Sequence, residues 1–385
     1  MKTMKWKFYS LAFVAGMSIL TACSSDDNND NDGNGGNGNG NEIENGTILK
    51  GTITSDVTLA AGNTYKLSGE YIVEEGATLH IEEGVKIIAV YDDIADYILV
   101  KQGGKINAVG TPDKPIVMTS EKEEPGAWGG IHICGRAHTN AEGGKGSSEI
   151  GGAVYGGNDD ADNSGTLQYI RLEYTGFAFD EEHEANGISF YGVGNGTIVD
   201  HCQAYKGSDD GFEFFGGSVN VSNLVAVSCS DDSFDWTEGW NGKGTNLVAY
   251  QEAESTLGYD CDCLMECDNN GSNNAATPVA HPVLKNLILV GNGGSKQGIR
   301  LRAGTEVEID NAKVCGKGQP LTVETALTEN ALKNGTSKLT NITLTSELSS
   351  KEGIYTHADF IAVTSNKVDA NLSYSSFEDI RKECS

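Results

Sequence analysis

Short runs in which apolar and polar residues alternate recur along most of the chain, and this pattern predicts β-strands that each bury one face. The clearest runs share one register, in which the second and fourth positions are small or apolar, such as Leu224 with Ala226 and Leu287 with Leu289. These runs span residues 169–173, 201–205, 223–227, 246–250, 286–290, 311–315 and 341–345. Because the chain also has 50 glycines and 6 prolines, we expect an all-β protein that is rich in turns.

The spacing of the runs predicts how the strands stack. Five runs begin with Asn, and Asn side chains hydrogen-bond along a column when equivalent residues lie one above another. The run SDDGFEF at 208–214 returns as SDDSFDW at 230–236, 22 positions later. This period fits one turn of a three-strand solenoid, whereas a propeller blade needs about twice as many residues. The sequence therefore predicts a right-handed parallel β-helix, with loop insertions where the interval is longer.

We expect the β-helix to occupy residues 46–385. Residues 71–87 have the same rhythm of short strands and glycine turns, and should form the first coils. The stretch 135–165 has nine glycines and little apolar content, which predicts a long excursion that could cover one end. Past residue 345 the pattern fades, and residues 373–382 are expected to form a capping helix.

The first residues have the pattern of an export signal. Lys2, Lys5 and Lys7 precede an apolar run at 8–20 that is too short for a stable membrane span. Leu20, Thr21 and Ala22 lead to Cys23 and resemble the lipobox of bacterial lipoproteins, which implies a signal peptide at 1–22 and lipidation of Cys23. Several acyl chains on one residue would anchor the protein durably to a membrane.

Residues 23–45 are expected to form a disordered acidic tether rich in Asn and Gly, because they lack the hydrophobic side chains that ordering requires. The acidic sequence 24–27 resembles the export tag of Bacteroidetes lipoproteins, which implies an outer-membrane protein that faces the cell exterior. The formal net charge is -28, and it becomes -31 without the three signal lysines. Such a surface excludes nucleic acid as a partner and attracts cations.

Eight cysteines follow Cys23, and their spacing does not match that of paired CxxC metal motifs. They are Cys134, Cys202, Cys229, Cys261, Cys263, Cys267, Cys315 and Cys384. Three of them cluster within residues 261–267 and are close enough for a local bridge. An exported location would permit disulfides, but the pairing cannot be derived from sequence spacing.

A candidate binding face follows from the alternation in one strand of each coil. Residues expected to point inward are Phe212, Phe214, Phe234, Trp236, Ile299 and Leu301. Residues expected to point outward into a ligand site are Glu213, Phe215, Asp235, Arg300 and Arg302, with Trp240 nearby and Asp209, Asp210, Asp231 and Asp232 at the strand entry. Coils about 4.8 Å apart would bring these carboxylates and guanidinium groups together, which suits a hydroxyl-rich ligand. Alternatively, the Asp pairs are ordinary turn residues and the arginines balance their charge.

A second possible contact surface is apolar. Val225, Val248 and Ile288 point outward in the predicted register and form a stripe along three coils. Such a stripe is typical of a partner-binding surface, or it is buried under the inserted loops.

Several motifs resemble those of the pectin-lyase-like β-helix lipoproteins of gut and marine Bacteroidetes. They lie at residues 76–84, 104–112, 128–131, 210–217 and 232–239. The resemblance implies the fold and supplies no activity, because this group has no settled function and a fold does not define one.

Three functions remain open from the sequence. The first is a non-catalytic surface protein that binds a glycan or another cell-surface partner. The second is a polysaccharide-cleaving hydrolase or lyase, because the order of Asp209 or Asp210, Asp231 or Asp232, and Arg300 or Arg302 faintly resembles the polygalacturonase family. That resemblance implies an acid, a base and a group that holds a substrate carboxylate. The family's Gly-His-Gly block is absent, and CLMEC at 263–267 stands in its place. The third is a purely structural surface protein.

A calcium site is expected at the strand entry. The 22-residue register places Asp209 and Asp210 one coil away from Asp231 and Asp232, and like charges on neighbouring strands repel. A hard divalent cation relieves this repulsion with oxygen ligands alone, and calcium tolerates irregular ligand sets.

Overall fold

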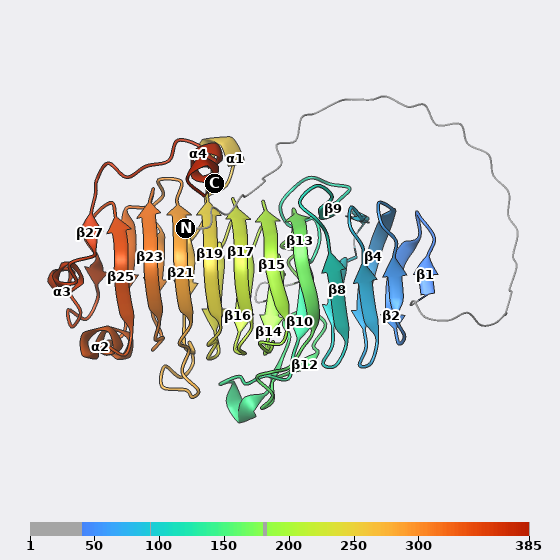
Figure 1. Ribbon diagram of the computed structural model, residues 1–385, viewed down its shortest axis with the longest axis horizontal. Coiled ribbons are helices and arrows are strands. Elements are labelled where there is room, and N and C mark those ends of the chain that lie inside the picture. Colours follow the sequence, from blue (N-terminus) through green and yellow to red (C-terminus); the bar gives the residue numbers. More distant parts are fainter. Residues whose placement is uncertain (1–40, 93, 180–182, 385) are drawn as a thin grey trace, which may run out of the picture.

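The computed structural model describes residues 41–92, 94–179 and 183–384, which form a right-handed parallel β-helix (Figure 1). Twenty-five strands join one sheet in which hydrogen-bonded neighbours run parallel, so the predicted fold class is confirmed. The first strand begins at Asn41, and the predicted boundary at residue 46 was therefore a few residues late. The expected signal peptide and Cys23 lie outside the described residues.

Each coil presents three faces, as the 22-residue period predicted. The first face consists of β1 (Asn41–Ile43), β3 (Val57–Leu59), β5 (Thr78–Ile81), β8 (Lys105–Val109) and the first halves of β13 (Gly165–Glu173), β15 (Ile198–Tyr205), β17 (Asn220–Val227), β19 (Lys243–Tyr250), β21 (Val283–Val290), β23 (Glu308–Cys315) and β25 (Lys338–Leu344). The second face consists of the first parts of β2 (Ile48–Ile53) and β4 (Thr64–Val73), then β6 (Lys86–Ala89), β9 (Ile116–Ser120), the second halves of the seven bent strands β13, β15, β17, β19, β21, β23 and β25, and β27 (Lys367–Val368).

The third face carries the predicted binding residues. It consists of the ends of β2 and β4, then β7 (Tyr97–Val100), β10 (Ile131–Cys134), β14 (Ile188–Tyr191), β16 (Phe212–Phe215), β18 (Phe234–Thr237), β20 (Met265–Cys267), β22 (Gln297–Leu301), β24 (Gln319–Val323) and β26 (Ser349–Ser350). The register Phe212 to Phe234 and Phe214 to Trp236 confirms the 22-residue coil that the sequence predicted.

A single left-handed residue makes the corner between the first and second faces. This residue has φ between 52° and 62° in all seven bent strands, at Tyr169, His201, Asn223, Asn246, Asn286, Asn311 and Asn341. Asn tolerates this conformation better than most residues with a Cβ. The Asn246 amide donates to Asn223 Oδ1, and Asn286 and Asn311 continue the column, each at 2.9 Å. The predicted Asn column is therefore confirmed for four of the five runs, whereas the amide of Asn341 donates to Asp310 Oδ1 instead.

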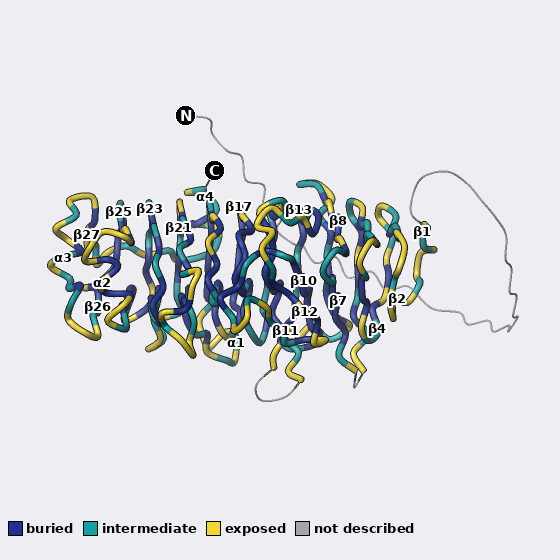
Figure 2. Tube along the Cα trace, turned by 90° about the horizontal axis from the view of Figure 1, so that it is seen from below, coloured by how far each residue is buried: buried dark blue, intermediate teal, exposed yellow. Residues whose placement is uncertain are grey.

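The core fills the interior of the solenoid, where apolar side chains from all three faces stack coil upon coil. Buried residues, dark blue in Figure 2, recur along the whole length of the solenoid. The six residues predicted to point inward from the third face are all buried. Aromatic rings stack along the axis, with 5.0 Å between the ring centroids of Phe190 and Phe214 and 5.6 Å between those of Phe212 and Phe234. Apolar area buried in this way contributes about 25 cal/mol per Å² to folding.

Three segments cover the solenoid, and two of them differ from expectation. The excursion at 135–165, with η1 (Glu142–Gly144) and the antiparallel pair β11 (Gly146–Ser147) and β12 (Val154–Tyr155), lies against the side of the third face and not over an end. The helix α4 (Phe377–Cys384) packs along the second face and is not a cap (Figure 1). The C-terminal end is closed by α2 (Ala326–Asn334) and α3 (His357–Ala362), whose Phe360 enters the core.

The 40-residue interval between Asn246 and Asn286 is a loop insertion, as predicted, and it includes α1 (Glu254–Leu257). Among the described residues, no helix has the length and apolar character needed to cross a membrane.

Candidate functional site

A cleft on the third face gathers the carboxylates that the sequence singled out. It has a volume of about 430 Å³ and is named the acidic cleft here. It is lined by Glu149, Glu184, Asp209, Asp210, Glu213, Asp231, Asp232, Asp235, Asp262, Glu266 and Arg300. The four Asp residues of the strand entry and the outward Glu213, Asp235 and Arg300 are therefore brought together as expected.

The parallel register sets the outward residues in one column. Glu213 pairs with Asp235 in the next coil, Asp235 with Glu266, and Glu266 with Arg300. Rungs of a parallel sheet are about 4.8 Å apart, so three carboxylates follow one another at close range before a positive charge is reached. The residue on the rung before Glu213 is the uncharged Ser189.

A second column lies at the entry to these strands, where each side chain caps the next coil. The backbone N–H of Asp232 donates to Asp210 Oδ1 at 2.8 Å, and that of Cys263 donates to Asp232 Oδ1 at 2.6 Å. Asp210 and Asp232 are each only 5% exposed. One oxygen of each carboxylate therefore caps a backbone N–H, as the alternative interpretation of the Asp pairs as turn residues held. Their second oxygens accept no hydrogen bond from the described residues, although both side chains line the cleft.

Burial and crowding favour the protonated carboxylic acids in this cleft. Burial, followed by the charge of neighbouring carboxylates, raises the pKa of Asp231 to about 6 and that of Asp209 to about 8. The same causes raise the pKa values of Asp210, Glu213, Asp232 and Asp235 well above their usual range. At neutral pH, protons or cations must therefore compensate the charge.

The spacing of the carboxylate oxygens suits a cation. Three groups of acidic side chains have ligand atoms that all lie within 4.8 Å of one another. They are Asp209, Asp210 and Asp231; Asp210, Glu213 and Asp235; and Asp232, Asp235 and Glu266. Two oxygens bound to one calcium ion at about 2.4 Å each are at most about 4.8 Å apart. The second and third groups are the same arrangement moved by one coil, and they share Asp235.

Asp235 lies at the middle of the run without a partner. No hydrogen bond or ion pair joins its side chain to the described residues, and its Oδ1 is buried and unsatisfied. A buried unsatisfied oxygen costs about 1 to 3 kcal/mol, and more if it is charged. Asp235 therefore keeps a buried oxygen without a hydrogen-bond partner, which a ligand could satisfy.

Hydrogen-bond donors occupy the two ends of the run. At one end the amide of Asn186 donates to Glu213 Oε2 at 2.6 Å. At the other end Arg300 Nη1 contacts Glu266 at 2.8 Å, and its Nη2 lies 3.3 Å from Glu324. Arg302 pairs with Glu266 and Asp268, at 2.7 Å each. The arginines therefore balance charge, as the alternative interpretation held, and Arg302 does not line the cleft.

Four carboxylates of the cleft were missed in the sequence, namely Glu149, Glu184, Asp262 and Glu266, and the first two come from outside the repeated strands. Glu149 comes from the excursion at 135–165, where Tyr191 donates a hydrogen bond to it and burial raises its pKa to about 7. Glu184 comes from a loop in which it bridges to Ala178. Neither residue belongs to a repeated strand, so the coil register gave no signal for them.

Comparison with known proteins identifies the family. A family model described as a pectate-lyase-like beta helix domain matches residues 51–383. The chain belongs to this family. No curated protein and no solved structure gives a significant match.

In this pectate-lyase-like β-helix, two predicted ligand residues are wrong because they are covered. Trp240 is 1% exposed and stacks on Phe214 with 4.2 Å between ring centroids, since the turn after β18 returns its indole to the core. Phe215 points outward but is 8% exposed, because it stacks on Tyr191 in the cluster beneath the excursion. The site therefore offers carboxylates and no exposed aromatic ring from these two positions.

The predicted local bridge within residues 261–267 is also absent. The eight cysteines of the described β-helix are all unpaired, and seven of them are buried. Burial raises the pKa of their thiols, as at Cys202 and Cys229, where it reaches about 12. Such thiols are poorly reactive.

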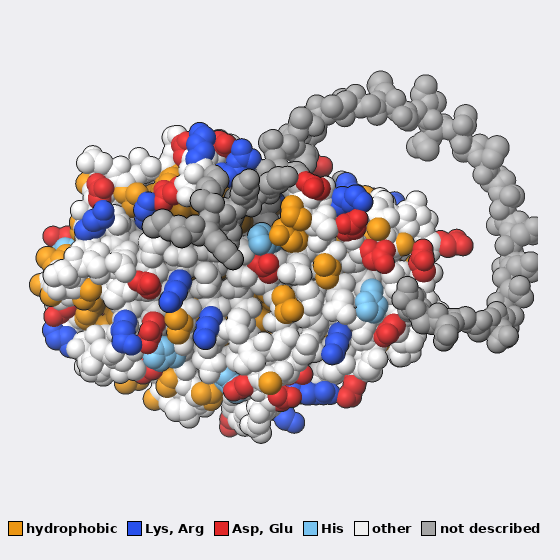
Figure 3. Space-filling view, in the orientation of Figure 1, with side chains coloured by type: hydrophobic (Ala, Val, Ile, Leu, Met, Phe, Trp, Pro, Cys, Tyr) orange, Lys and Arg blue, Asp and Glu red, His pale blue; other side chains and the backbone are white. Residues whose placement is uncertain are grey.

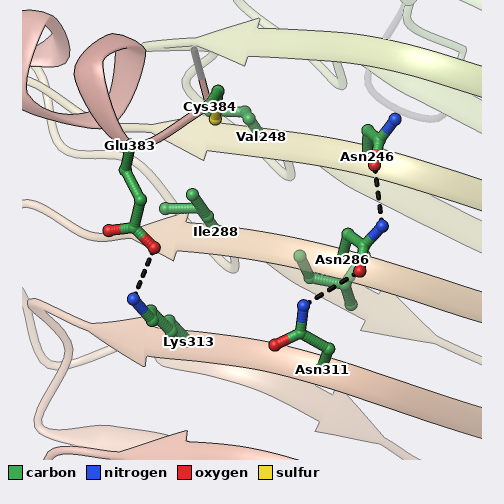
Figure 4. A pocket seen from close by; sticks show the side chains of 9 residues that line it. Asn246, Val248, Asn286, Ile288, Asn311, Lys313, Glu383 and Cys384 are labelled. Atoms are coloured by element: carbon green, nitrogen blue, oxygen red, sulfur yellow. Dashed lines mark hydrogen bonds and ion pairs between the residues drawn. The ribbon is translucent and has the colours of Figure 1, made fainter. Parts of the chain in front are cut away.

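Two of the three residues of the apolar stripe are buried, and Ile288 is half-buried in the same cluster, so the stripe is not a free contact surface. Val225 and Val248 are 3% and 2% exposed, because they pack in one cluster with Ile380 of α4. The cover is the C-terminal segment and not the inserted loops. At the end of α4 a small pocket of about 170 Å³ remains, where the Asn column meets the ion pair between Lys313 and Glu383 (Figure 4).

Outside the cleft, charges are mixed. On the face drawn in Figure 3, acidic and basic side chains are interspersed among uncharged ones. Exposed pairs such as Lys66 with Glu121 and Lys338 with Glu308 balance charge locally. The acidic cleft differs because its lining holds ten carboxylates and one arginine.

Proposed function

We propose that this β-helix is a non-catalytic, calcium-dependent receptor for acidic glycans. The observation that supports the proposal is the unpartnered Asp235 carboxylate at the centre of two overlapping groups of acidic ligands. Calcium binds six to eight oxygens at about 2.3 to 2.6 Å and accepts irregular sets of carboxylates. The carboxylates of the cleft supply part of such a set, and the glycan completes it.

The charge of the protein supports a bridging cation. With a net charge of -28, the protein repels an acidic polysaccharide unless a cation lies between them. Sugar hydroxyl and carboxylate oxygens are hard ligands that complete a calcium sphere. The cleft volume of about 430 Å³ lies within the usual range of small-ligand sites, about 300 to 1,000 Å³.

Calorimetric titration with oligogalacturonate tests this proposal. We expect binding in millimolar calcium and none in chelator. Asp235→Asn removes one charge at constant shape and should abolish most of the calcium-dependent binding. Asp56→Asn is the matched control, because Asp56 is exposed on another face and caps Thr78, which Asn also does. Equal binding with and without calcium, or in Asp235→Asn, would contradict the proposal.

Polysaccharide cleavage is the second candidate function. It is favoured by the pKa values of Asp231 and Asp209, about 6 and 8, which lie near those that acid–base catalysis requires. Against it, Arg300 is already paired with Glu266 and Glu324 and does not offer a free guanidinium to a substrate carboxylate.

We predict no release of reducing or unsaturated ends from polygalacturonate or host glycans, because no histidine is among the described residues that line the cleft and Arg300 is paired. Product analysis after prolonged incubation is the measurement. Turnover that is lost in Asp231→Asn and retained in Asp56→Asn would establish the enzyme instead of the receptor. If neither glycan binding nor turnover is observed, the result favours the purely structural role.

We also propose that lipid on Cys23 holds the β-helix at the outer membrane, facing the cell exterior. The support is the basic and apolar sequence that precedes this cysteine. Cys23→Ala is predicted to move the protein from the membrane fraction to the soluble fraction. Cys384→Ala, which removes a cysteine of α4, is the control. Membrane retention of the Cys23→Ala protein would refute the lipid anchor.

A further inference from the structure

A buried lysine lies between two coils, next to a side-chain amide and close to a carboxylate. Lys317 follows β23 and is 4% exposed. Its Nζ donates to Cys261 O at 2.9 Å and to Asn292 Oδ1 at 3.1 Å. The amide of Asn292, which follows β21, donates in turn to Asp260 Oδ1 at 2.9 Å. An amine, an amide and a carboxylate are thus joined in one series of contacts, and the proposed function does not use them.

The surroundings of Lys317 favour its uncharged, nucleophilic form. Its stem packs on the backbone of Gly291, where an added Cβ would lie 2.5 Å from Lys317 Cγ. Burial lowers the pKa of the Lys317 ammonium group, although the charge of Asp260 opposes the shift. A neutral amine has two N–H donors, and Nζ has two acceptors within the described part of the chain. Both donors are therefore satisfied in the neutral amine, whose lone pair is available for reaction.

The side-chain amide of Asn292 is placed as the electrophile. Its Oδ1 accepts a further hydrogen bond from the backbone N–H of Gly294 at 3.2 Å, which stabilises negative charge that develops on this oxygen. Because a C=O bond is about 1.23 Å long, Asn292 Cγ lies at most about 4.3 Å from Lys317 Nζ. Atoms react from about 3 to 3.5 Å, so a shift of less than about 1 Å is sufficient. Asp260 contacts Nδ2, the nitrogen that an attack on Cγ would expel.

We propose that Lys317 and Asn292 form an intramolecular isopeptide bond, with Asp260 as the group that transfers the protons. The bond joins the coil of β21 covalently to the coil of β23, two strands that already pair in parallel. It is a self-catalysed modification of the scaffold. It goes beyond the proposed function and does not depend on glycan or calcium binding.

The reaction replaces one amide by another, and its atoms balance. The Lys317 ammonium group gives up two protons, and its Nζ forms a bond to Asn292 Cγ. The bond from Cγ to Nδ2 breaks. Nδ2 takes up the two protons through Asp260 and leaves as an ammonium ion. Charge is conserved, and neither an oxidant nor a reductant takes part. Asp260 therefore acts first as a base toward the amine and then as an acid toward the leaving nitrogen.

Tryptic peptide mapping of the full chain, denatured after it has folded, tests the proposal by mass spectrometry. Trypsin does not cleave after an acylated lysine, because acylation removes the charge. We expect peptide 286–296 joined to peptide 314–333, lighter than the sum of the two by one ammonia molecule. Lys317→Arg should release peptide 286–296 at its full mass. Lys338→Arg is the matched control, because Lys338 is an exposed lysine paired with Glu308, and it should keep the joined product.

Asp260→Asn keeps an acceptor for the Asn292 amide and removes the proton carrier. It should form the bond at least about 100-fold more slowly, the low end of what general acid–base catalysis contributes, and therefore be isolated largely without it.

A competing reaction of the same asparagine gives a different product. Asn292 is followed by Gly293, whose backbone nitrogen can attack Cγ and form a succinimide with the same loss of ammonia. In the natural protein, a light peptide 286–296 that is not joined to 314–333, or both peptides at full mass, would overturn the proposal. These outcomes are read from the natural chain, so they decide the matter even if Lys317→Arg does not fold.

Discussion

The asparagines at the strand corners combine two roles that the sequence pattern alone did not separate. The repeat predicted a hydrogen-bonded column, and Asn223, Asn246, Asn286 and Asn311 form it. The left-handed backbone at these positions was not predicted, because alternation of apolar and polar residues carries no information on φ. Tyr169 and His201 occupy the same corner, so side-chain hydrogen bonding is favourable there but not obligatory.

Asn286→Ala should lower the free energy of unfolding by about 2 kcal/mol, since it deletes two amide hydrogen bonds and leaves a Cβ residue at φ 60° without local compensation. Asn286→Gly deletes the same bonds and accepts this φ, so it should lose less. Urea denaturation measures both variants. Equal losses would show that the left-handed conformation contributes nothing to the choice of Asn.

At the scale of elements, the repeated strands were predictable and the segments that cover them were not. Strands that alternate with period two reveal which residues point inward, and this was right for Phe212, Phe234 and Trp236. The alternation of apolar and polar residues is the same whether an outward apolar residue such as Val248 is exposed or covered. Its cover, α4, follows a long stretch without repeats, and nothing in its sequence specifies the coil on which it docks.

In the candidate site, too, residues on the repeated strands were predictable and residues on turns and on the excursion were not. Glu213 and Asp235 were predicted because they occupy equivalent rungs of successive coils. Trp240 was wrong because it follows the last strand residue, where a turn and not alternation decides its direction. Glu149 was missed because the excursion that carries it has its own antiparallel pairing.

Ile380→Ser should undock α4, because Ile380 is 1% exposed and packs with Val225 and Val248 on the second face. We expect increased binding of a hydrophobic dye and faster proteolysis near the C-terminus, with the far-ultraviolet circular dichroism of the β-helix retained. Lys382→Ser changes an exposed residue of the same helix and is the control. Dye binding that is the same in both variants would mean that α4 is not held by this contact.

At the scale of the whole molecule, the acidic cleft gathers ten carboxylates beside one arginine, whereas many acidic side chains elsewhere have a basic partner of their own. Solenoid geometry is the cause, because a coil of constant length repeats any outward carboxylate at about 4.8 Å. Like charges at this distance destabilise the fold unless they are protonated or bound to a cation. The parallel register fixes these carboxylates in one column, and the solution conditions then decide whether protons or cations compensate their charge.

Because protons and calcium compete for the carboxylates of the cleft, we predict that the stabilisation by calcium depends on pH. The raised pKa values of Asp231 and Asp209, about 6 and 8, mean that the metal-free folded protein holds protons which the unfolded chain releases above its ordinary carboxylate pKa near 4. Stability in chelator is therefore highest at low pH and is lost as pH rises through about 6 and 8. Calcium competes with these protons, so it binds weakly at pH 5 and strongly at pH 8.

Thermal unfolding of residues 41–385 in chelator and in millimolar calcium measures this competition. Calcium should raise the midpoint more at pH 8 than at pH 5, since a ligand at about 100 times its Kd adds about 2.7 kcal/mol to the folded state. Asp209→Asn combined with Asp231→Asn should lose most of the increment at pH 8 and also the decline of stability in chelator, because both effects come from the same carboxylates. Asp56→Asn should keep both. A calcium increment of equal size at the two pH values would show that the ion binds outside the cleft, and the crowded carboxylates would then be compensated by protons alone.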